Sequence, residues 1–112
     1  MTFIKACSIS DIPDGGVVGI EVEGTPVALV RKDSEVFALY DVCSHAEVRL
    51  SEGDVYDDTL ECWLHGSCFD VRSGKPTGPP AVRPVPVYRV KLEGDDVLVS
   101  LDGADHVENG ES

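Results

Sequence analysis

Cys43-Ser44-His45 and Cys62-Trp63-Leu64-His65 are the two stretches that decide how the rest of this 112-residue sequence is interpreted. Each stretch pairs one thiol with one imidazole, and residues 46–61 separate the two pairs. Thiolate is a soft ligand that suits iron bound to sulfide, and imidazole suits iron or zinc. Two mixed pairs at such short spacing predict a metal centre whose ligands are these two cysteines and these two histidines.

The order of the ligands favours two metal ions over one. Zinc fingers usually present two cysteines and then two histidines, with all four ligands around one ion. Here each stretch offers one of each kind, so in the predicted arrangement Cys43 and Cys62 hold one iron, and His45 and His65 hold the other. A [2Fe–2S] centre in which two histidines replace two cysteines is the Rieske type.

Zinc is the alternative metal, because two cysteines and two histidines also make a tetrahedral zinc site. The single residue between Cys43 and His45 is a shorter gap than zinc ligands usually show, which counts against zinc. The colour of the protein and its iron content separate the two possibilities.

The two loops resemble those of Rieske proteins, and the chain resembles the small Rieske-type ferredoxins of bacterial aromatic-ring dioxygenase systems. The resemblance covers about residues 1–102 and is supported more weakly by Ser51-Glu52-Gly53 and Gly78-Pro79-Pro80. It implies a single all-β domain with the Rieske fold, in which an antiparallel β-sandwich base carries an inserted cluster-binding lobe at about residues 42–82. Residues 103–112 are expected to form a disordered acidic tail.

Short segments that alternate apolar and polar residues, separated by turn residues, independently predict an all-β fold. We expect strands over residues 3–9, 17–23, 27–31, 36–40, 68–71, 87–92 and 97–101. Turns are expected at residues 24–26 and 93–96, and a four-residue loop at 32–35. Residues 54–60 are expected to form a loop that feeds a strand into Cys62. Five prolines within residues 76–86 predict a stiff, extended connection.

Length and charge limit the classes of function. One domain is expected for 112 residues. No apolar run approaches the roughly 20 residues of a membrane helix, and no secretory signal is visible, so a cytoplasmic protein without membrane association is expected. The net charge of −12 argues against nucleic-acid binding. It favours partners with a basic docking surface, although solubility alone is an alternative explanation.

The resemblance also bears on the reduction potential. It implies that Ser67 donates a hydrogen bond to the cluster, but Phe69 stands where the high-potential branch of the family has a tyrosine donor. Cys68 has no cysteine partner in the first loop, so the loop disulfide of that branch is absent. We therefore expect a potential near the bottom of the Rieske range of roughly −150 to +300 mV. Cys7 and Cys68 are expected to be small apolar residues in strands.

Two further residues are expected beside the cluster. Trp63 lies between two ligands, where it would shield the cluster from water or form part of a docking face. Pro79 belongs to a segment that resembles the third loop of the family, which covers the cluster, although a rigid connector is the alternative.

These features predict a one-electron carrier that is not an enzyme by itself. The resemblance implies transient docking with a flavin-dependent ferredoxin reductase as electron donor and a terminal non-haem iron oxygenase as acceptor. Two alternatives stay open from the sequence: the small subunit of a nitrite reductase, and a binding module that responds to the redox state of an iron–sulfur cluster.

Overall fold

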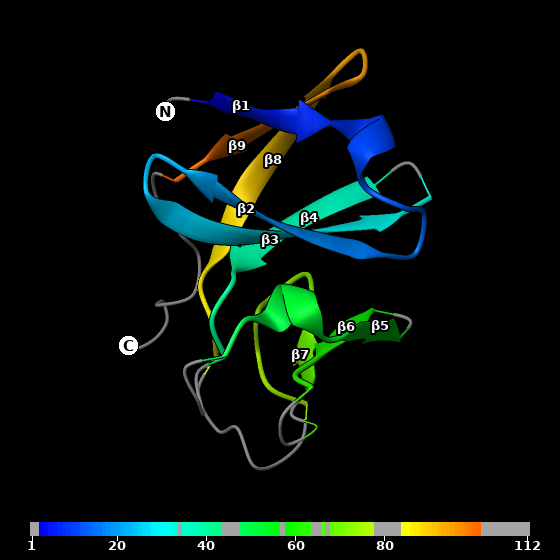
Figure 1. The fold of residues 1–112 in the computed structure, drawn as a ribbon, viewed down its shortest axis with the longest axis vertical. Helices are drawn as coiled ribbons and strands as arrows, with labels where there is room; N and C mark the ends of the chain where they lie inside the picture. The colour runs from blue at the N-terminus through cyan, green and yellow to red at the C-terminus, as the bar shows by residue number, and fades with distance from the viewer. Residues whose placement is uncertain are drawn as a thin grey trace.

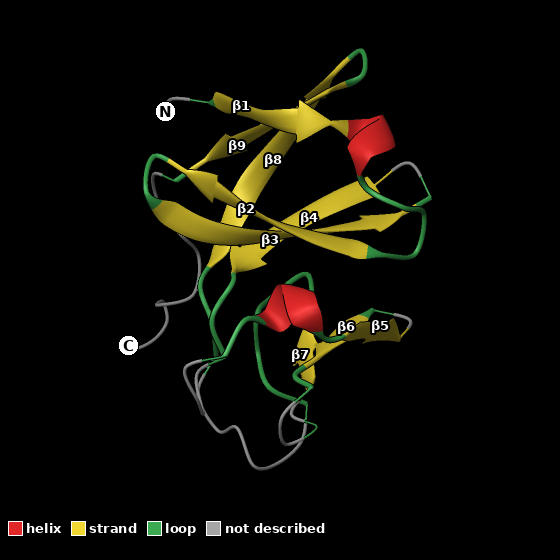
Figure 2. Cartoon of the chain, in the orientation of Figure 1, coloured by secondary structure: helices red, strands yellow, loops and turns green. Residues whose placement is uncertain are grey.

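A computed structural model describes residues 3–33, 35–43, 48–56, 58–63, 66, 68–77 and 84–101. Within these ranges the regular structure is β-strand together with two short 3₁₀ turns (Figure 2), so the predicted all-β class is confirmed. The strands are β1 (Ile4–Ser8), β2 (Val17–Val22), β3 (Thr25–Lys32), β4 (Glu35–Tyr40), β5 (Asp54–Tyr56), β6 (Thr59–Glu61), β7 (Cys68–Asp70), β8 (Val87–Glu93) and β9 (Asp96–Ser100). The turns are η1 (Ile9–Asp11) and η2 (Leu50–Glu52).

Six strands form the base of the molecule, an antiparallel sheet in the order β1-β9-β8-β4-β3-β2. Figure 1 shows this sheet curled, so that β1 and β2 at its two ends lie near each other. Apolar residues from both halves of the sheet pack together in one buried cluster, here called the base core. Its buried members are Ile12, Val22, Val27, Leu29, Val36, Ala38, Val97 and Val99. The sandwich-like base predicted from the resemblance is therefore confirmed.

The turns of the base contain fewer residues than the sequence pattern predicts. Val22 pairs with Thr25, so the turn is Glu23-Gly24, and both turn residues have positive φ, 50° and 82°. Thr25 and Pro26 already belong to β3, and the prediction that they form part of the turn is wrong. Lys32 likewise pairs with Glu35, which leaves residues 33 and 34 as the loop between β3 and β4. The two-residue turn suits the right-handed twist of the paired strands.

A smaller lobe is inserted between β4 and β8 and lies below the base in Figure 1. It consists of η2 and a three-stranded antiparallel sheet in the order β5-β6-β7. Leu50–Gly53 comprises η2 and its C-terminal cap. Residues 54–60 are not a loop as expected, because Asp54–Tyr56 pairs with Thr59–Glu61 as a hairpin.

The lobe has its own buried cluster, here called the lobe core, which shares no residue with the base core. Strand β3 joins the two, since side chains alternate across a strand. Val27 and Leu29 face the base core, whereas Ala28 and Val30 face the lobe core. Being covered on both sides explains why this strand is a continuous apolar run.

Several predictions of extent fall beyond the described residues. The tail at 103–112 and residues 78–83 of the proline-rich connection lie outside them. The limits of the single domain, 1–102, and of the lobe, 42–82, therefore stay predictions. None of the helical turns in the described ranges has the length or apolar character needed to span a bilayer.

Candidate metal centre

The first predicted ligand, Cys43, follows the end of β4 by three residues and is buried. Its backbone N–H donates a hydrogen bond to the carbonyl of Val48 at 3.0 Å. This bond joins the two ends of the segment 43–48, here called the first ligand loop. His45 belongs to the loop but lies outside the described residues, so its role as a ligand stays a prediction.

The second predicted ligand, Cys62, comes directly after β6 and is also buried. The N–H of Gly66 donates to the carbonyl of Cys62 at 3.0 Å, a bond that joins the two ends of the segment 62–66. Gly66 has φ +74°, a conformation that strains residues with a side chain. His65 and Ser67 flank this glycine but lie outside the described residues.

The fold brings the two thiols together. Cys43 and Cys62, 19 residues apart in the sequence, are members of the same lobe core. None of the four cysteines forms a disulfide, which agrees with the absence of a loop disulfide expected from the sequence. Two buried thiols in one cluster, each followed closely in sequence by a histidine, are a donor set that fits a group needing soft ligands.

The described residues alone do not complete a metal site. They contain no group of three or more histidine, cysteine, aspartate or glutamate side chains placed to hold a metal ion. Because His45 and His65 fall outside the described ranges, only the cysteine half of the predicted ligand set is located.

The other two cysteines, Cys7 and Cys68, lie in strands. Cys7 lies in β1 and Cys68 in β7, as predicted. Burial raises the pKa of both thiols, assisted by the charge of Asp11 beside Cys7 and of Glu61 beside Cys68. A raised pKa disfavours the thiolate that a metal requires.

Trp63 is exposed to solvent, whereas Phe69 is buried. The Trp63 side chain is 52% exposed, which favours the docking interpretation over that of a buried shield. Phe69 is fully buried in the lobe core and has no hydroxyl to donate to a sulfur.

The segment after β7 is fixed at both ends to the lobe, although Pro79 itself lies outside the described residues. Thr77 N–H donates to the Cys68 carbonyl at 2.8 Å, and Val85 N–H donates to the Gly74 carbonyl at 2.9 Å. Gly74 has φ +76°, and a Cβ there would lie 2.1 Å from the Val85 carbonyl oxygen. The chain can therefore cross this closely only at a glycine.

Sequence reasoning missed Asp41, a fully buried carboxylate two residues before Cys43. Its side chain accepts hydrogen bonds from Ser51 and Arg49. An aspartate at the end of an apolar strand was the available signal, because a buried charge needs such partners.

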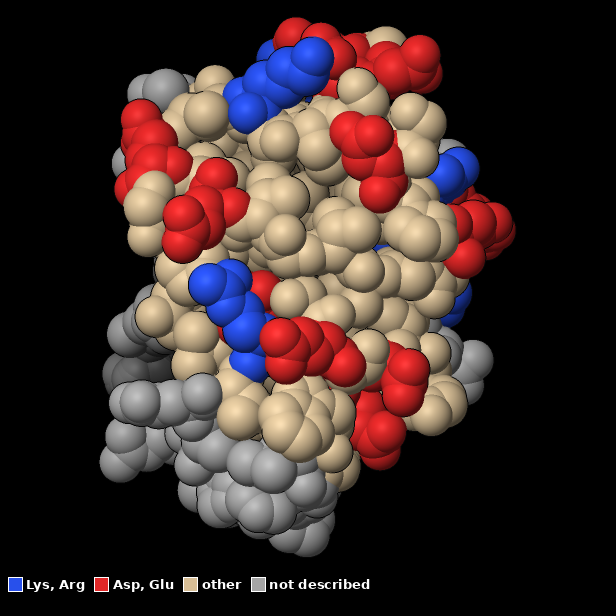
Figure 3. Space-filling model, viewed as in Figure 1, with Lys and Arg blue, Asp and Glu red and all other residues tan. Residues whose placement is uncertain are grey.

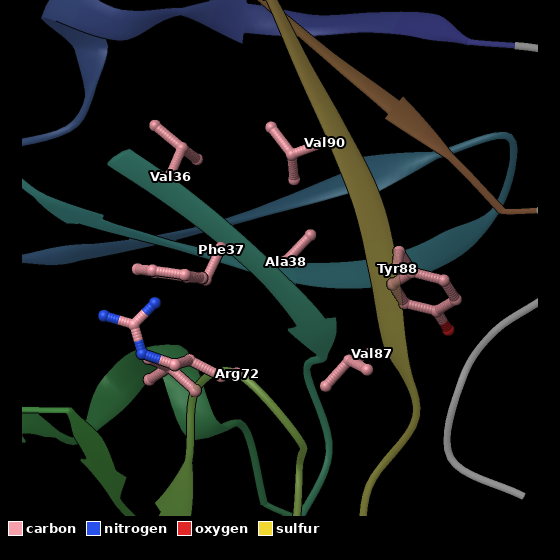
Figure 4. A pocket seen from close by; sticks show the side chains of 8 residues that line it. Val36, Phe37, Ala38, Arg72, Val87, Tyr88 and Val90 are labelled. Carbon is pink, nitrogen blue, oxygen red and sulfur yellow. The ribbon is translucent and has the colours of Figure 1, made fainter. Parts of the chain in front are cut away.

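A cavity of about 180 Å³ lies where β4 and β8 diverge, close to the junction of the base and the lobe (Figure 4). Val36, Phe37 and Val90 help to line it, and the Arg72 guanidinium lies 4.8 Å from the centre of the Phe37 ring. No cysteine lines this cavity, so it is separate from the candidate metal centre.

Acidic side chains outnumber basic ones in this chain, 21 to 9. In the view of Figure 3, acidic groups lie at the top and along both margins, and few basic groups accompany them. Two of the arginines near the lobe are paired with carboxylates, Arg49 with Asp41 and Arg72 with Glu35 and Asp58. They are therefore not available as a free basic patch.

The chain is similar to known proteins in sequence and in structure. A model of the Rieske [2Fe-2S] domain matches residues 2–89. The biphenyl dioxygenase ferredoxin subunit of Pseudomonas sp. strain KKS102 is 44% identical over 93% of this chain and 96% of its own length.

Two solved structures extend the comparison. The ferredoxin of carbazole 1,9a-dioxygenase from Nocardioides aromaticivorans IC177 has a TM-score of 0.86 and 35% identity, over 89% of this chain and 98% of that one. The complex of reduced oxygenase and oxidized ferredoxin in carbazole 1,9a-dioxygenase contains a chain with a TM-score of 0.82 and 32% identity, over 88% and 92%.

Proposed function

Since the chain belongs to the Rieske [2Fe-2S] domain family, we propose that Cys43, His45, Cys62 and His65 hold its one cluster. The burial of Cys43 and Cys62 in one core is the observation that supports this assignment. The two cysteines would hold one iron and the two histidines the other, in keeping with the Rieske ligand pattern.

The protein is a ferredoxin component of a Rieske dioxygenase system and transfers electrons to a terminal oxygenase. It is a carrier and not the catalytic oxygenase. When bound, the cluster supplies one-electron redox chemistry, with a higher potential than four thiolates would give because imidazole is neutral.

The residues of the chain create the conditions for this transfer. Burial of Cys43 and Cys62 excludes water from the sulfur ligands and keeps their surroundings of low polarity. Cys7 and Cys68 lie in β1 and β7, and partial burial raises the pKa of both thiols, which disfavours the thiolate form that iron binds. The half-exposed indole of Trp63, which directly follows Cys62, offers an apolar surface to a docking partner.

Transient docking with an oxygenase and a flavin-dependent reductase is the proposed partner pattern. A complex with oxygenase is known for the carbazole 1,9a-dioxygenase ferredoxin. A net charge of −12 would steer this chain toward basic partner surfaces, in the cytoplasm as expected from the sequence. The rate of electron transfer from a reductase should then fall steeply as salt is added.

The deciding experiment is electron paramagnetic resonance of the dithionite-reduced protein, with iron and acid-labile sulfide measured on the same sample. We expect a Rieske-type signal and two irons and two sulfides per chain, which follows from the cluster type. A colourless protein that contains zinc and no sulfide would refute the proposal.

A redox titration tests the expected low potential. Phe69 cannot donate a hydrogen bond to the cluster, and such bonds raise the potential. The midpoint should therefore lie near the bottom of the range of roughly −150 to +300 mV. A midpoint near the top would contradict this part of the proposal.

A further inference from the structure

Asp41 is a charged residue with no exposed side-chain surface in the described part of the chain. Three donors converge on its carboxylate. The Ser51 N–H donates to Oδ1 at 2.6 Å, the Ser51 hydroxyl donates to Oδ2 at 2.6 Å, and Arg49 Nη1 donates to Oδ2 at 3.4 Å. All three of these partners are donors, and one of them is a cation, so both carboxylate oxygens are used as acceptors.

The backbone of Asp41 is fixed as well. Its N–H donates to the Pro26 carbonyl in β3 at 3.1 Å, and its carbonyl accepts the N–H of Leu50 at 3.4 Å. One residue thereby connects the end of β4 to β3 on one side and to η2 on the other.

The side chains of Asp41 and Ser51 pack against Gly19 of β2 in the base. A Cβ at Gly19 would lie 2.4 Å from Ser51 Oγ and 2.6 Å from Asp41 Oδ2. The absence of a side chain at Gly19 therefore lets η2, which lies beneath β2 and β3 in Figure 1, approach the base closely. We call the contact among Gly19, Asp41 and Ser51 the Asp41 clasp.

The clasp encloses the first ligand loop. Cys43 and Val48 close the loop through one backbone hydrogen bond, and immediately outside it Asp41 holds residues 49–51. Both chain ends that leave the loop are thus fixed to the same carboxylate. The position of Cys43 relative to the opposite loop depends on this fixed frame.

We propose that Asp41 is a positioning residue of the metal centre, which holds the first ligand loop at the spacing that binding of the cluster requires. The inference rests on the proposed cluster site. It assigns to the carboxylate no contact with the cluster, and it predicts that loss of the clasp changes cluster geometry and retention.

Asp41→Asn tests the proposal in the cluster-loaded protein. The amide replaces one acceptor oxygen with a donor, which then faces a Ser51 or Arg49 donor without a partner. We expect the rate at which visible absorbance is lost in excess chelator to rise about ten- to hundredfold, the effect typical of residues that orient metal ligands. The signal of the reduced protein should broaden, because the cluster geometry becomes heterogeneous.

Asp58→Asn is the matched control. Asp58 also joins the lobe to the base, through Lys32 of β3, and pairs with Arg72 within the lobe. Its substitution removes the same charge, but it contacts neither end of the first loop. Its rate of cluster loss should stay within about twofold of wild type, as for most substitutions at exposed ion pairs. Equal effects of the two substitutions would overturn the proposal.

Ser51→Ala separates positioning from charge, because it removes one hydrogen bond and keeps the carboxylate. A smaller change in the same direction, in both cluster loss and line width, supports positioning. If Ser51→Ala matches wild type and Asp41→Asn shifts only the midpoint potential, Asp41 acts through its charge and the proposal fails.

Gly19→Ala and Ser51→Ala carry the test if Asp41→Asn does not fold. Wild-type protein that lacks a Rieske-type signal would refute the proposed function. Wild-type protein that shows the signal, with clasp variants indistinguishable from it, would refute only the role of Asp41.

Discussion

In the base, buried side chains come from strands of five to eight residues, whereas β5, β6 and β7 of the lobe have three residues each. The base core is made of aliphatic residues from paired strands and η1's C-terminal cap, Ile12. The lobe core includes Cys43 and Cys62 and borrows Ala28, Val30 and Leu39 from the base. Because the sheet of the lobe is short, the stability of the lobe depends on a few individual side-chain contacts and on the group that its cysteines bind.

This comparison teaches how one small chain divides its tasks. Long strands with alternating side chains form a stable platform through many equivalent contacts. The lobe is shaped instead by the Asp41 clasp, by close approaches at Gly53 and Gly74, and by two loops that begin at buried thiols. If the division is real, the two regions should respond differently to equivalent substitutions.

The largest effect is expected from Cys62→Ser. Loss of a cysteine ligand should abolish the visible absorbance of the cluster, because the hydroxyl is a poor ligand for iron in this setting. The base core contains no predicted ligand, so the far-ultraviolet circular dichroism of its strands should be largely retained. Trp63, the single tryptophan, should report the change in the lobe by its fluorescence.

Cys7→Ser is the control for that substitution, since Cys7 lies in β1 of the base. It should keep the absorbance of wild type. Loss of the strand signal in Cys62→Ser would show that the base cannot fold without the metal centre, and would end the proposed division.

A matched pair of core truncations gives the next largest effect. Leu29 and Leu60 are both fully buried, the first in the base core and the second in the lobe core. Each change to alanine should lower the free energy of unfolding by roughly 2–5 kcal/mol. Only Leu60→Ala should also hasten cluster loss in chelator. Equal rates of cluster loss would indicate that the two cores act as one.

How far the sequence predicts the molecule differs between the same two regions. The β8–β9 hairpin and β2 follow from alternation and turn residues, because in the base local pattern and final structure agree. The β5–β6 hairpin was missed, since strands of three residues show too little alternation to be distinguished from a loop.

The site divides in the same way. Cys43 and Cys62 are recognisable because a thiol with a histidine close behind it is a rare local pattern. The partners of Asp41 are not recognisable, because Gly19 and Ser51 are remote from it in sequence and meet only through the sheet. Contacts of this kind depend on tertiary structure, for which a single sequence carries no local signal.

Two glycine substitutions test the close contacts of the lobe. A Cβ at Gly53 would lie 1.7 Å from the Glu61 carbonyl oxygen, while its φ of −92° is available to any residue. Gly53→Ala should therefore cost roughly 1–3 kcal/mol through steric displacement of β6. It should also change the fluorescence of Trp63, which follows β6 by two residues.

Gly24→Ala is the counterpart in the base. Gly24 has φ +82° and open space around its Cα, so the cost comes from the backbone alone and should be about 1–2 kcal/mol. Its effect should leave Trp63 fluorescence and cluster retention unchanged. A change in either property would show that strain in the β2–β3 turn is transmitted to the lobe.

The smallest effect is expected at Asp58, where the lobe meets the base through an exposed ion pair with Lys32, next to a second pair with Arg72 inside the lobe. The hydrogen bond from Lys32 holds the pKa of this carboxyl below its ordinary value of 3.8. A depressed pKa stabilises the folded protein above that value, and the contribution is lost as the pH falls through the folded-state pKa.

The urea midpoint of Asp58→Asn should thus lie slightly below that of wild type at neutral pH and low salt. The gap should narrow as salt screens the pair and close below pH 3.8. A gap that persisted in acid would mean that the Asp58 side chain stabilises the junction by packing or by hydrogen bonds that do not depend on its charge. The Asp58 contact would then stabilise the junction mainly by position, as the buried Asp41 clasp is proposed to do, and not by its charge.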